Sequence, residues 1–155
     1  MRIVPIAIAS AAMLAAASVA ANVSAPQAAQ IMHDRHEGME NIGDAFKALH
    51  REFDSSSAFV PTVRTSAGRI ATLSRKASGW FPVGTGPEVG KTGAKPEIWQ
   101  NPQDFAAKLS AFQRAAQVLN AAAASGDLDL AKARFVDLGG TCKACHDKYR
   151  LEIHR

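Results

Sequence analysis

The 155-residue sequence contains only two cysteines, Cys142 and Cys145, and just two residues separate them. A pair this close cannot close a long loop, so the sequence excludes the disulfide framework typical of small exported domains. Aromatic residues are also scarce, at 6% of the chain. No basic tract with interleaved aromatic side chains occurs, which disfavours nucleic-acid binding. The cysteine pair therefore needs a chemical explanation other than a structural disulfide.

Large apolar side chains are few, because much of the 47% hydrophobic content is alanine. Alanine favours helices, and a core of this composition would gain from a bulky apolar cofactor. The length corresponds to one domain. The formal net charge is +4, with basic residues spread along the chain rather than concentrated in one tract.

The N-terminal segment has the layout of a secretory signal peptide. Arg2 precedes an uncharged, alanine-rich run over Ile3–Ala20, and small residues up to Ala21 supply a cleavage site. A membrane anchor is the alternative, since the run approaches spanning length. No later segment is apolar enough to span a membrane. We therefore expect a cleaved signal peptide over residues 1–21 and a soluble, periplasmic domain over residues 22–155.

Four segments carry the spacing of apolar residues that predicts amphipathic helices, and no strands are expected. Asn101 and Asp127 are good N-caps for the third and fourth segments, and Phe59 heads the apolar stripe of the second. Four helices with short connections and one long crossover predict an all-α helical bundle. The segments are approximately Pro26–Phe53, Ser57–Ala77, Asn101–Ser125 and Asp127–Tyr149.

The crossover between the second and third helical segments, residues 78–100, is rich in glycine and proline. A loop this long in a small domain is usually functional or packed by its own side chains, and Trp80 and Trp99 could supply that packing. Its stretch Gly84–Thr92 resembles a phosphate-binding loop. However, Thr85 stands where that motif requires glycine and no strand precedes it, so we reject a nucleotide site.

The sequence Cys142–His146 reads C-x-x-C-H, the attachment signature of c-type haem. On a helix the two thiols lie close enough to reach the two vinyl groups of one porphyrin, and the adjacent imidazole can then bind the iron. A thioredoxin-like site would need a βαβ context. A structural zinc site would need more ligands at short spacing, and His154, eight residues after His146, is the only other nearby candidate. We predict one covalent haem c on Cys142 and Cys145, with His146 as an axial iron ligand.

The chain resembles the class II cytochromes c, the cytochrome c′ family, whose haem motif lies near the C-terminus. The resemblance covers essentially the whole mature chain. It implies an antiparallel four-helix bundle, often dimeric, with a long loop between the second and third helices and one haem in the core. The segments that carry it are Pro96–Trp99, Ala124–Leu128, Cys142–Arg150 and the pattern Arg35-x-x-x-Met39-x-x-Ile42-Gly43.

The resemblance leaves two functions open, which differ in the sixth iron ligand. Cytochromes c′ have no protein ligand on the distal side and bind small gases such as nitric oxide or carbon monoxide. Low-spin relatives place a first-helix methionine sulfur on the iron and carry electrons, because Met/His ligation raises the reduction potential. Met39 follows Arg35 by four residues, where the family puts its distal side chain, and Met32 shares roughly that face. Ligation by Met39, by Met32 or by neither stays open, since methionine is also adaptable packing material.

Other groups gain roles from the same resemblance. Arg35 matches a family arginine near the haem propionates, with a helix-surface charge as the alternative. Trp80 and Phe81 match an aromatic that shields a haem edge, with loop packing as the alternative. Basic residues from Lys143 to Arg150 flank the motif. They would steer an acidic redox partner, or they form a solvated face.

The sequence therefore predicts a periplasmic monohaem cytochrome that transfers electrons to a redox partner protein, with a gas-binding cytochrome c′ as the alternative. We do not expect an enzyme, because a peroxidase needs a distal acid–base pair and His36 would have to turn inward to supply one. His33 and His36 are expected to face solvent rather than bind a metal. A homodimer through the first two helices is a further implication of the resemblance.

Overall fold

The computed structural model describes residues 23–151, so the predicted signal peptide lies outside the described residues. Within this range the chain is helical, and none of its helices is long and apolar enough to cross a membrane. Only an isolated bridge between Ala94 and Arg150 has β character in the same range. The elements are α1 (Ala25–Asp54), α2 (Val60–Lys76), η1 (Ala77–Gly79), α3 (Glu97–Gln100), α4 (Pro102–Ser125) and α5 (Leu128–Tyr149).

Local sequence signals set the ends of the long helices. At the start of α1 the amide of Ser24 donates to Gln27 Oε1 over 3.1 Å, as in a capping box. Gly126 ends α4 with a φ of 85°, a conformation that glycine adopts without steric cost. Asp127 then caps α5 by accepting a hydrogen bond from the Leu130 amide at 2.9 Å. The predicted boundary between the third and fourth helices is therefore confirmed.

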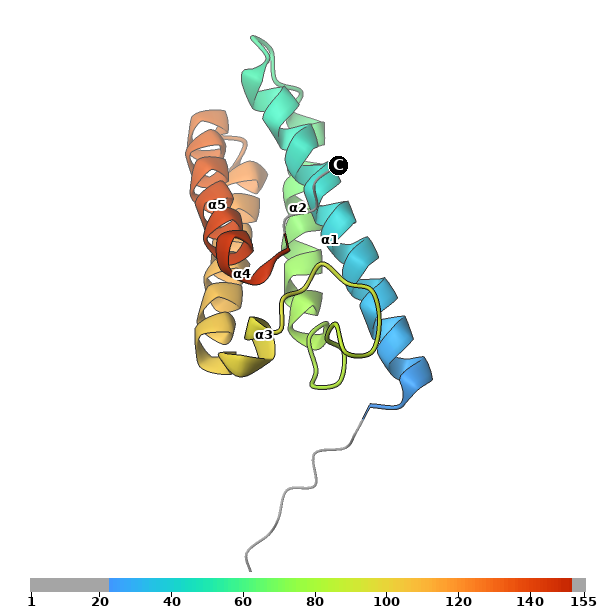
Figure 1. Cartoon of the computed structure of the whole chain (residues 1–155). Helices are drawn as coiled ribbons and strands as arrows, with labels where there is room; N and C mark the ends of the chain where they lie inside the picture. Colours follow the sequence, from blue (N-terminus) through green and yellow to red (C-terminus); the bar gives the residue numbers. More distant parts are fainter. Residues whose placement is uncertain (1–22, 152–155) are drawn as a thin grey trace, which may run out of the picture.

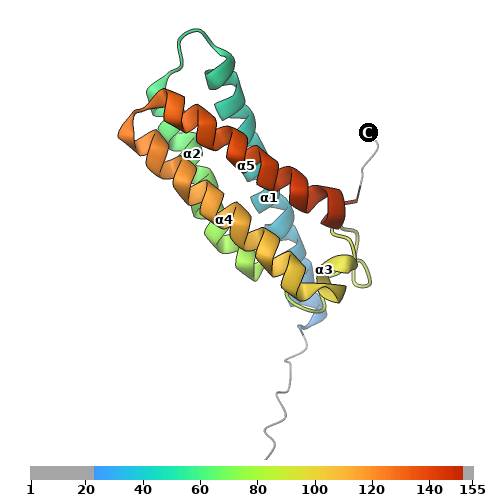
Figure 2. The ribbon, with the colours of Figure 1, turned by 90° about the vertical axis from the view of Figure 1, so that its left-hand side faces the viewer.

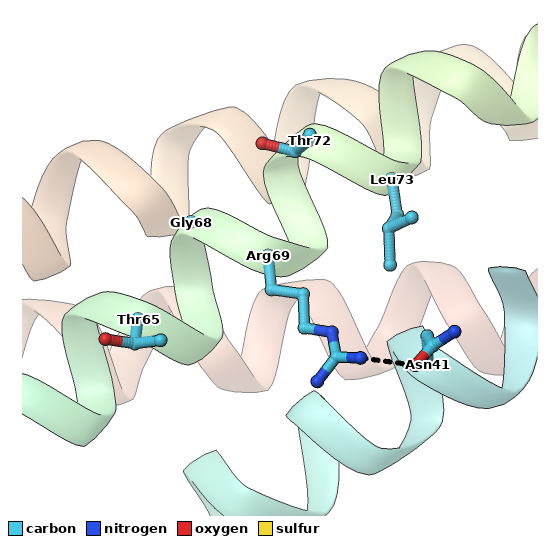
Figure 3. A pocket seen from close by; sticks show the side chains of 6 residues that line it. All are labelled: Asn41, Thr65, Gly68, Arg69, Thr72 and Leu73. Carbon is cyan, nitrogen blue, oxygen red and sulfur yellow. Dashed lines mark hydrogen bonds between the residues drawn. The ribbon is translucent and has the colours of Figure 1, made fainter.

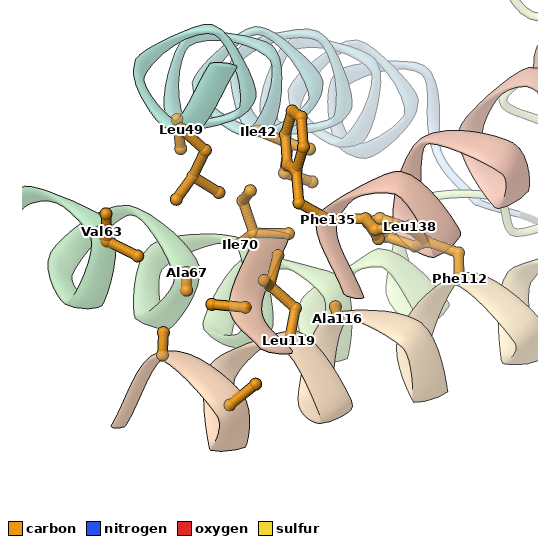
Figure 4. Packing of buried hydrophobic residues seen from close by; sticks show 14 of the residues in the cluster. Ile42, Leu49, Val63, Ala67, Ile70, Phe112, Ala116, Leu119, Phe135 and Leu138 are labelled. Carbon is orange, nitrogen blue, oxygen red and sulfur yellow. The ribbon is translucent and has the colours of Figure 1, made fainter. Parts of the chain in front are cut away.

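The four long helices form an antiparallel bundle, as predicted. Close backbone contacts join α1 to α2, α2 to α4 and α4 to α5. In Figures 1 and 2, α1 and α2 form one layer and α4 and α5 the other, with successive helices running in opposite directions. Leucine, isoleucine and phenylalanine side chains from all four helices meet in the core, and small alanines such as Ala67 and Ala116 are fully buried between them (Figure 4). This alanine content allows the helices to pack closely.

The α1 and α5 helices meet through large side chains rather than close backbone contact. The ring centroids of Phe46 and Phe135 are 4.3 Å apart, and those of Phe53 and Phe135 are 5.4 Å apart. Gly139 of α5 faces this group, because a Cβ at that position would lie 3.3 Å from Phe46 Cζ. The layers are therefore held apart by aromatic side chains around Phe135, about two turns before Cys142 on α5.

The long connection between α2 and α4 contains η1 and α3, neither of which we predicted. It lies across the end of the bundle where α5 finishes (Figure 2). The Lys95 amide donates to the Tyr149 carbonyl over 2.9 Å, and the Leu151 amide donates to the Gly93 carbonyl over 2.8 Å. These bonds fasten the loop to the end of the helix that carries the C-x-x-C-H motif.

Phe59 departs from the prediction, because its side chain is 62% exposed. It precedes the first residue of α2 and serves as its N-cap, so it lies outside the helical stripe that begins with Val60. The apolar face of α2 starts instead at Val63, which is fully buried.

Candidate functional site

Cys142 and Cys145 are both half-buried on one face of α5, one turn apart. Cys142 packs against the main core, whereas Cys145 packs against a second apolar cluster, here called the loop cluster. Phe81 and Leu109 contact both clusters, so the two thiols face one continuous apolar region. The loop cluster consists of Ala94, Ile98, Phe105 and Tyr149.

Apolar surroundings keep both thiols in their neutral form. Burial, with a smaller contribution from the neighbouring Cys145, raises the pKa of the Cys142 thiol to about 11. Burial also raises the pKa of the Cys145 thiol. A catalytic or redox-exchanging cysteine needs a lowered pKa. The electrostatics of the pair therefore argue against a thioredoxin-like function and leave the thiols as attachment points.

His146 follows Cys145 directly and lies in the last turn of α5. Its side chain is exposed to solvent, yet partial desolvation by neighbouring residues lowers its pKa. The charge of Arg150 adds to this lowering and that of Asp147 opposes it. A lowered pKa favours the neutral imidazole, which is the form that ligates a metal. Two thiols and one neutral imidazole within five consecutive residues of a helix make a donor set that fits a c-type haem.

The structure separates the two candidate methionines. Met39 is partly buried and packs against the main core, as Cys142 does. Met32 lies against the long loop, where a Cβ on Gly90 would be 3.1 Å from Met32 Cε. Met39 therefore packs against the same core as Cys142, whereas Met32 lies beside the long loop.

Arg35 is buried, with 5% of its surface exposed, so the alternative of a helix-surface charge is wrong. Its guanidinium donates hydrogen bonds to the Trp80 carbonyl, to Thr85 and to Thr92, all in the long loop. Burial lowers the pKa of Arg35, and the charge of Glu88 partly offsets this. A role at the haem propionates stays a prediction.

Trp80 is buried in the main core, and the outer edge of its ring lies against α1 at Gly38. A Cβ at Gly38 would be 2.2 Å from Trp80 Cη2, closer than any side chain tolerates. The adjacent Phe81 stands between the main core and the loop cluster, with its ring 4.8 Å from that of Phe105. Both aromatic residues therefore border the region that the thiols face.

Two basic residues beside the motif, Lys143 and Lys148, are paired with acids. Lys148 Nζ lies 2.9 Å from Asp104 Oδ2, and the Tyr149 hydroxyl donates to the same oxygen. These two hydrogen bonds, that of Tyr149 first, lower the pKa of Asp104. Lys143 is likewise paired with Asp147. Much of the local positive charge is thus neutralised, which favours the alternative that this is a solvated face.

The polar groups that hold the long loop were missed by sequence reasoning. Thr85 and Thr92 bind Arg35 across about fifty residues of sequence, and no local pattern marks them. His33 and His36, by contrast, are exposed as expected, each beside a glutamate four residues on. No group of three or more His, Cys, Asp or Glu side chains within residues 23–151 is arranged to hold a metal ion.

An all-helical bundle whose last helix carries C-x-x-C-H, with both cysteines packed on apolar clusters, has the features of a c-type cytochrome. The chain belongs to the cytochrome c′ family, because the family model described as cytochrome c′ matches residues 30–150. It is 33% identical to the cytochrome c′ of Allochromatium vinosum over 143 residues, or 90% of each chain.

Solved structures agree with this membership. A cytochrome c′ with an unusual ligand-controlled dimer dissociation is 28% identical, with a TM-score of 0.75 over 81% of this chain and 97% of that chain. A nitric oxide complex of a mutant cytochrome c′ from Alcaligenes xylosoxidans is 30% identical, with a TM-score of 0.72 over 84% of this chain and 99% of that chain.

The predicted family, the four-helix fold and one covalently attached c-type haem are thereby confirmed. The comparisons also favour the gas-binding alternative over electron transfer, which the sequence analysis put first.

Proposed function

We propose that this protein binds a small gas, such as nitric oxide or carbon monoxide, at its haem. A c-type haem supplies an iron that changes between ferrous and ferric states and takes diatomic ligands. The observation that carries the proposal is the apolar character of the region faced by the thiols. Like Cys142, the partly buried side chains of Met39, Phe46, Phe81 and Leu109 pack against the main core.

This environment bears on catalysis as well. A peroxidase-like enzyme needs an acid–base pair close to the reacting oxygen atoms. His36 lies on the exposed face of α1 beside Glu40, where it cannot supply such a pair to the core on which Cys142 packs. We therefore propose ligand binding without catalysis.

In this proposal each residue of the site has one task. Cys142 and Cys145 would hold the haem through thioether bonds, which prevent its loss from an exported protein. His146 is the axial iron ligand, and its neutral form suits that role. Met39, Trp80 and Phe81, which belong to or pack against the main core, would shield the bound haem from water.

Electron transfer to a redox partner protein remains a second candidate, and one observation favours it. The thioether of Met39 lies in the same cluster as Cys142. A sulfur bound opposite His146 would raise the reduction potential of the iron, as carriers require. The distinction between the two functions thus depends on whether Met39 ligates or only packs.

Export and assembly complete the proposal. The signal-like N-terminus supports a periplasmic location, where c-type haem would be attached. The similarity to a cytochrome c′ whose dimer dissociates under ligand control supports a homodimer. On the face that such a dimer would use, an open groove lies between α1 and α2. Figure 3 shows this groove, across which Arg69 donates to Asn41. Its lining residues are Asn41, Thr65, Gly68, Arg69, Thr72 and Leu73.

Met39→Leu is the substitution that separates the two functions. Leucine conserves the volume of methionine and is expected to cost less than about 1.5 kcal/mol of stability. If the protein binds gases, electron paramagnetic resonance of the ferric protein gives a high-spin signal that Met39→Leu leaves unchanged. Met32→Leu is the matched control, because Met32 lies against Gly90 in the loop. A low-spin wild-type signal that becomes high-spin only in Met39→Leu would refute gas binding as the resting function.

A further inference from the structure

Both Nη atoms of the Arg35 guanidinium donate hydrogen bonds to the long loop. Nη1 donates to the Trp80 carbonyl at 3.0 Å and to Thr85 Oγ1 at 3.3 Å. Nη2 donates to the Thr85 carbonyl at 2.9 Å and to Thr92 Oγ1 at 3.0 Å. Each Nη atom carries two N–H bonds, so these four contacts use all of them. Only the Nε–H group is left for any other acceptor.

Aromatic side chains enclose the same charge. The guanidinium carbon lies 5.2 Å from the ring centroid of Phe81 and 6.0 Å from that of Trp99. Both distances are within the range of a cation–π contact. Trp99 in turn donates from Nε1 to the carbonyl oxygens of Phe81, at 3.2 Å, and Pro82, at 3.0 Å. Arg35 and Trp99 therefore both donate hydrogen bonds to carbonyl groups of the segment 80–82.

This segment is the part of the loop that borders the attachment site. Trp80 belongs to the main core that contacts Cys142, and Phe81 contacts both that core and the loop cluster beside Cys145. The other end of the loop is fastened independently to the end of α5. The Lys95 amide donates to the Tyr149 carbonyl, and the Leu151 amide donates to the Gly93 carbonyl. A change at Arg35 should thus release residues 80–92 without releasing residues 93–95.

We infer that Arg35 is a positioning residue, which holds Trp80 and Phe81 in place as one wall of the haem site by binding the loop acceptors between residues 80 and 92. The inference rests on haem attachment to α5 and is independent of whether the iron binds a gas. A planar fork is required for this role, because four acceptors in different directions must be met at once. A lysine ammonium has three donors and no fork, so it cannot replace the guanidinium.

The test compares amide hydrogen exchange of the haem-loaded protein in four variants. Arg35→Lys and Arg35→Met are both expected to speed exchange in residues 80–92 by roughly ten-fold or more, since each loses several bonds that close the loop. Thr92→Val removes one acceptor and is expected to give a smaller acceleration in the same residues. Arg75→Met is the matched control, because Arg75 is an exposed arginine that binds Gln117 and Thr72 on the bundle surface.

The competing role, neutralising a haem carboxylate by charge alone, gives a different pattern. Arg35→Lys would then retain wild-type exchange and wild-type reduction potential, and Thr92→Val would change neither. That result would overturn the inference. If Arg35→Met does not fold, Arg35→Lys and Thr92→Val still decide between the patterns. Failure of carbon monoxide to bind the wild-type protein would refute the proposed function but leave these exchange results intact.

Discussion

Replacing both Cys142 and Cys145 with alanine is expected to abolish covalent haem attachment, so that the denatured protein gives no haem-stained band after electrophoresis. These are the only two cysteines in the chain, and no other side chain can form the thioether bonds. Each single substitution is expected to leave one thioether and a weaker band. Because both thiols are half-buried in apolar surroundings, alanine fits there without leaving a buried polar group unpaired.

Lys143→Ala is the matched control for this experiment. Lys143 lies between the cysteines but is exposed, and it pairs with Asp147 on the surface of α5. The control variant should retain the full haem-stained band, because exposed ion pairs contribute little to stability. A full band in the double cysteine variant would contradict the assignment of the attachment site.

The second large effect is expected at Gly38. Gly38→Ala places a Cβ 2.2 Å from the buried ring of Trp80, so the ring or the helix must shift. Overpacking of this kind typically costs about 1–3 kcal/mol of the free energy of unfolding. Thermal unfolding followed by circular dichroism is expected to show a lower midpoint. Because Trp80 borders the attachment site, its near-ultraviolet signal should change as well.

Gly43→Ala on the same helix is expected to have the opposite effect on the free energy of unfolding. A Cβ at Gly43 meets nothing within 4 Å. Alanine is the better helix former, so this substitution should stabilise the protein by about 0.5–1 kcal/mol. If both variants shifted the midpoint equally, the close packing of Trp80 on α1 would be disproved.

The chemistry of the site could be predicted from sequence because it is local. Cys142, Cys145 and His146 lie within five consecutive residues, and helical geometry alone places both thiols on one face. The helix ends were equally local, since Gly126 and Asp127 mark a boundary through their own backbone and side-chain preferences. Such features depend on neighbours in sequence, which a single chain displays directly.

Features that depend on the long loop could not be predicted in the same way. Met32 and Met39 are seven residues apart and share a helix face, so periodicity treats them alike. What separates them is the contact of Met32 with Gly90, which lies nearly sixty residues further along the chain. The partners of Arg35 are similarly distant in sequence. The local pattern around Thr85 and Thr92 resembles only a phosphate-binding loop and gives no sign of their contact with Arg35.

Phe59 illustrates a different limit. Its spacing to Val63 fits a helical stripe, but the helix begins after it, at Val60. A periodic pattern predicts which face is apolar and does not determine where the first turn starts. The Phe59 side chain, which the periodic pattern places at the start of the buried face, is therefore exposed.

The most direct test of gas binding is the addition of carbon monoxide to the reduced wild-type protein, followed by optical spectroscopy. The apolar surroundings of Cys142 and the membership of the cytochrome c′ family predict a prompt spectral change that saturates at one carbon monoxide per haem. A reduced spectrum that carbon monoxide leaves unaltered would mean that a protein side chain holds the sixth position. That result would contradict the proposed function and leave electron transfer, with Met39 as the ligand, in its place.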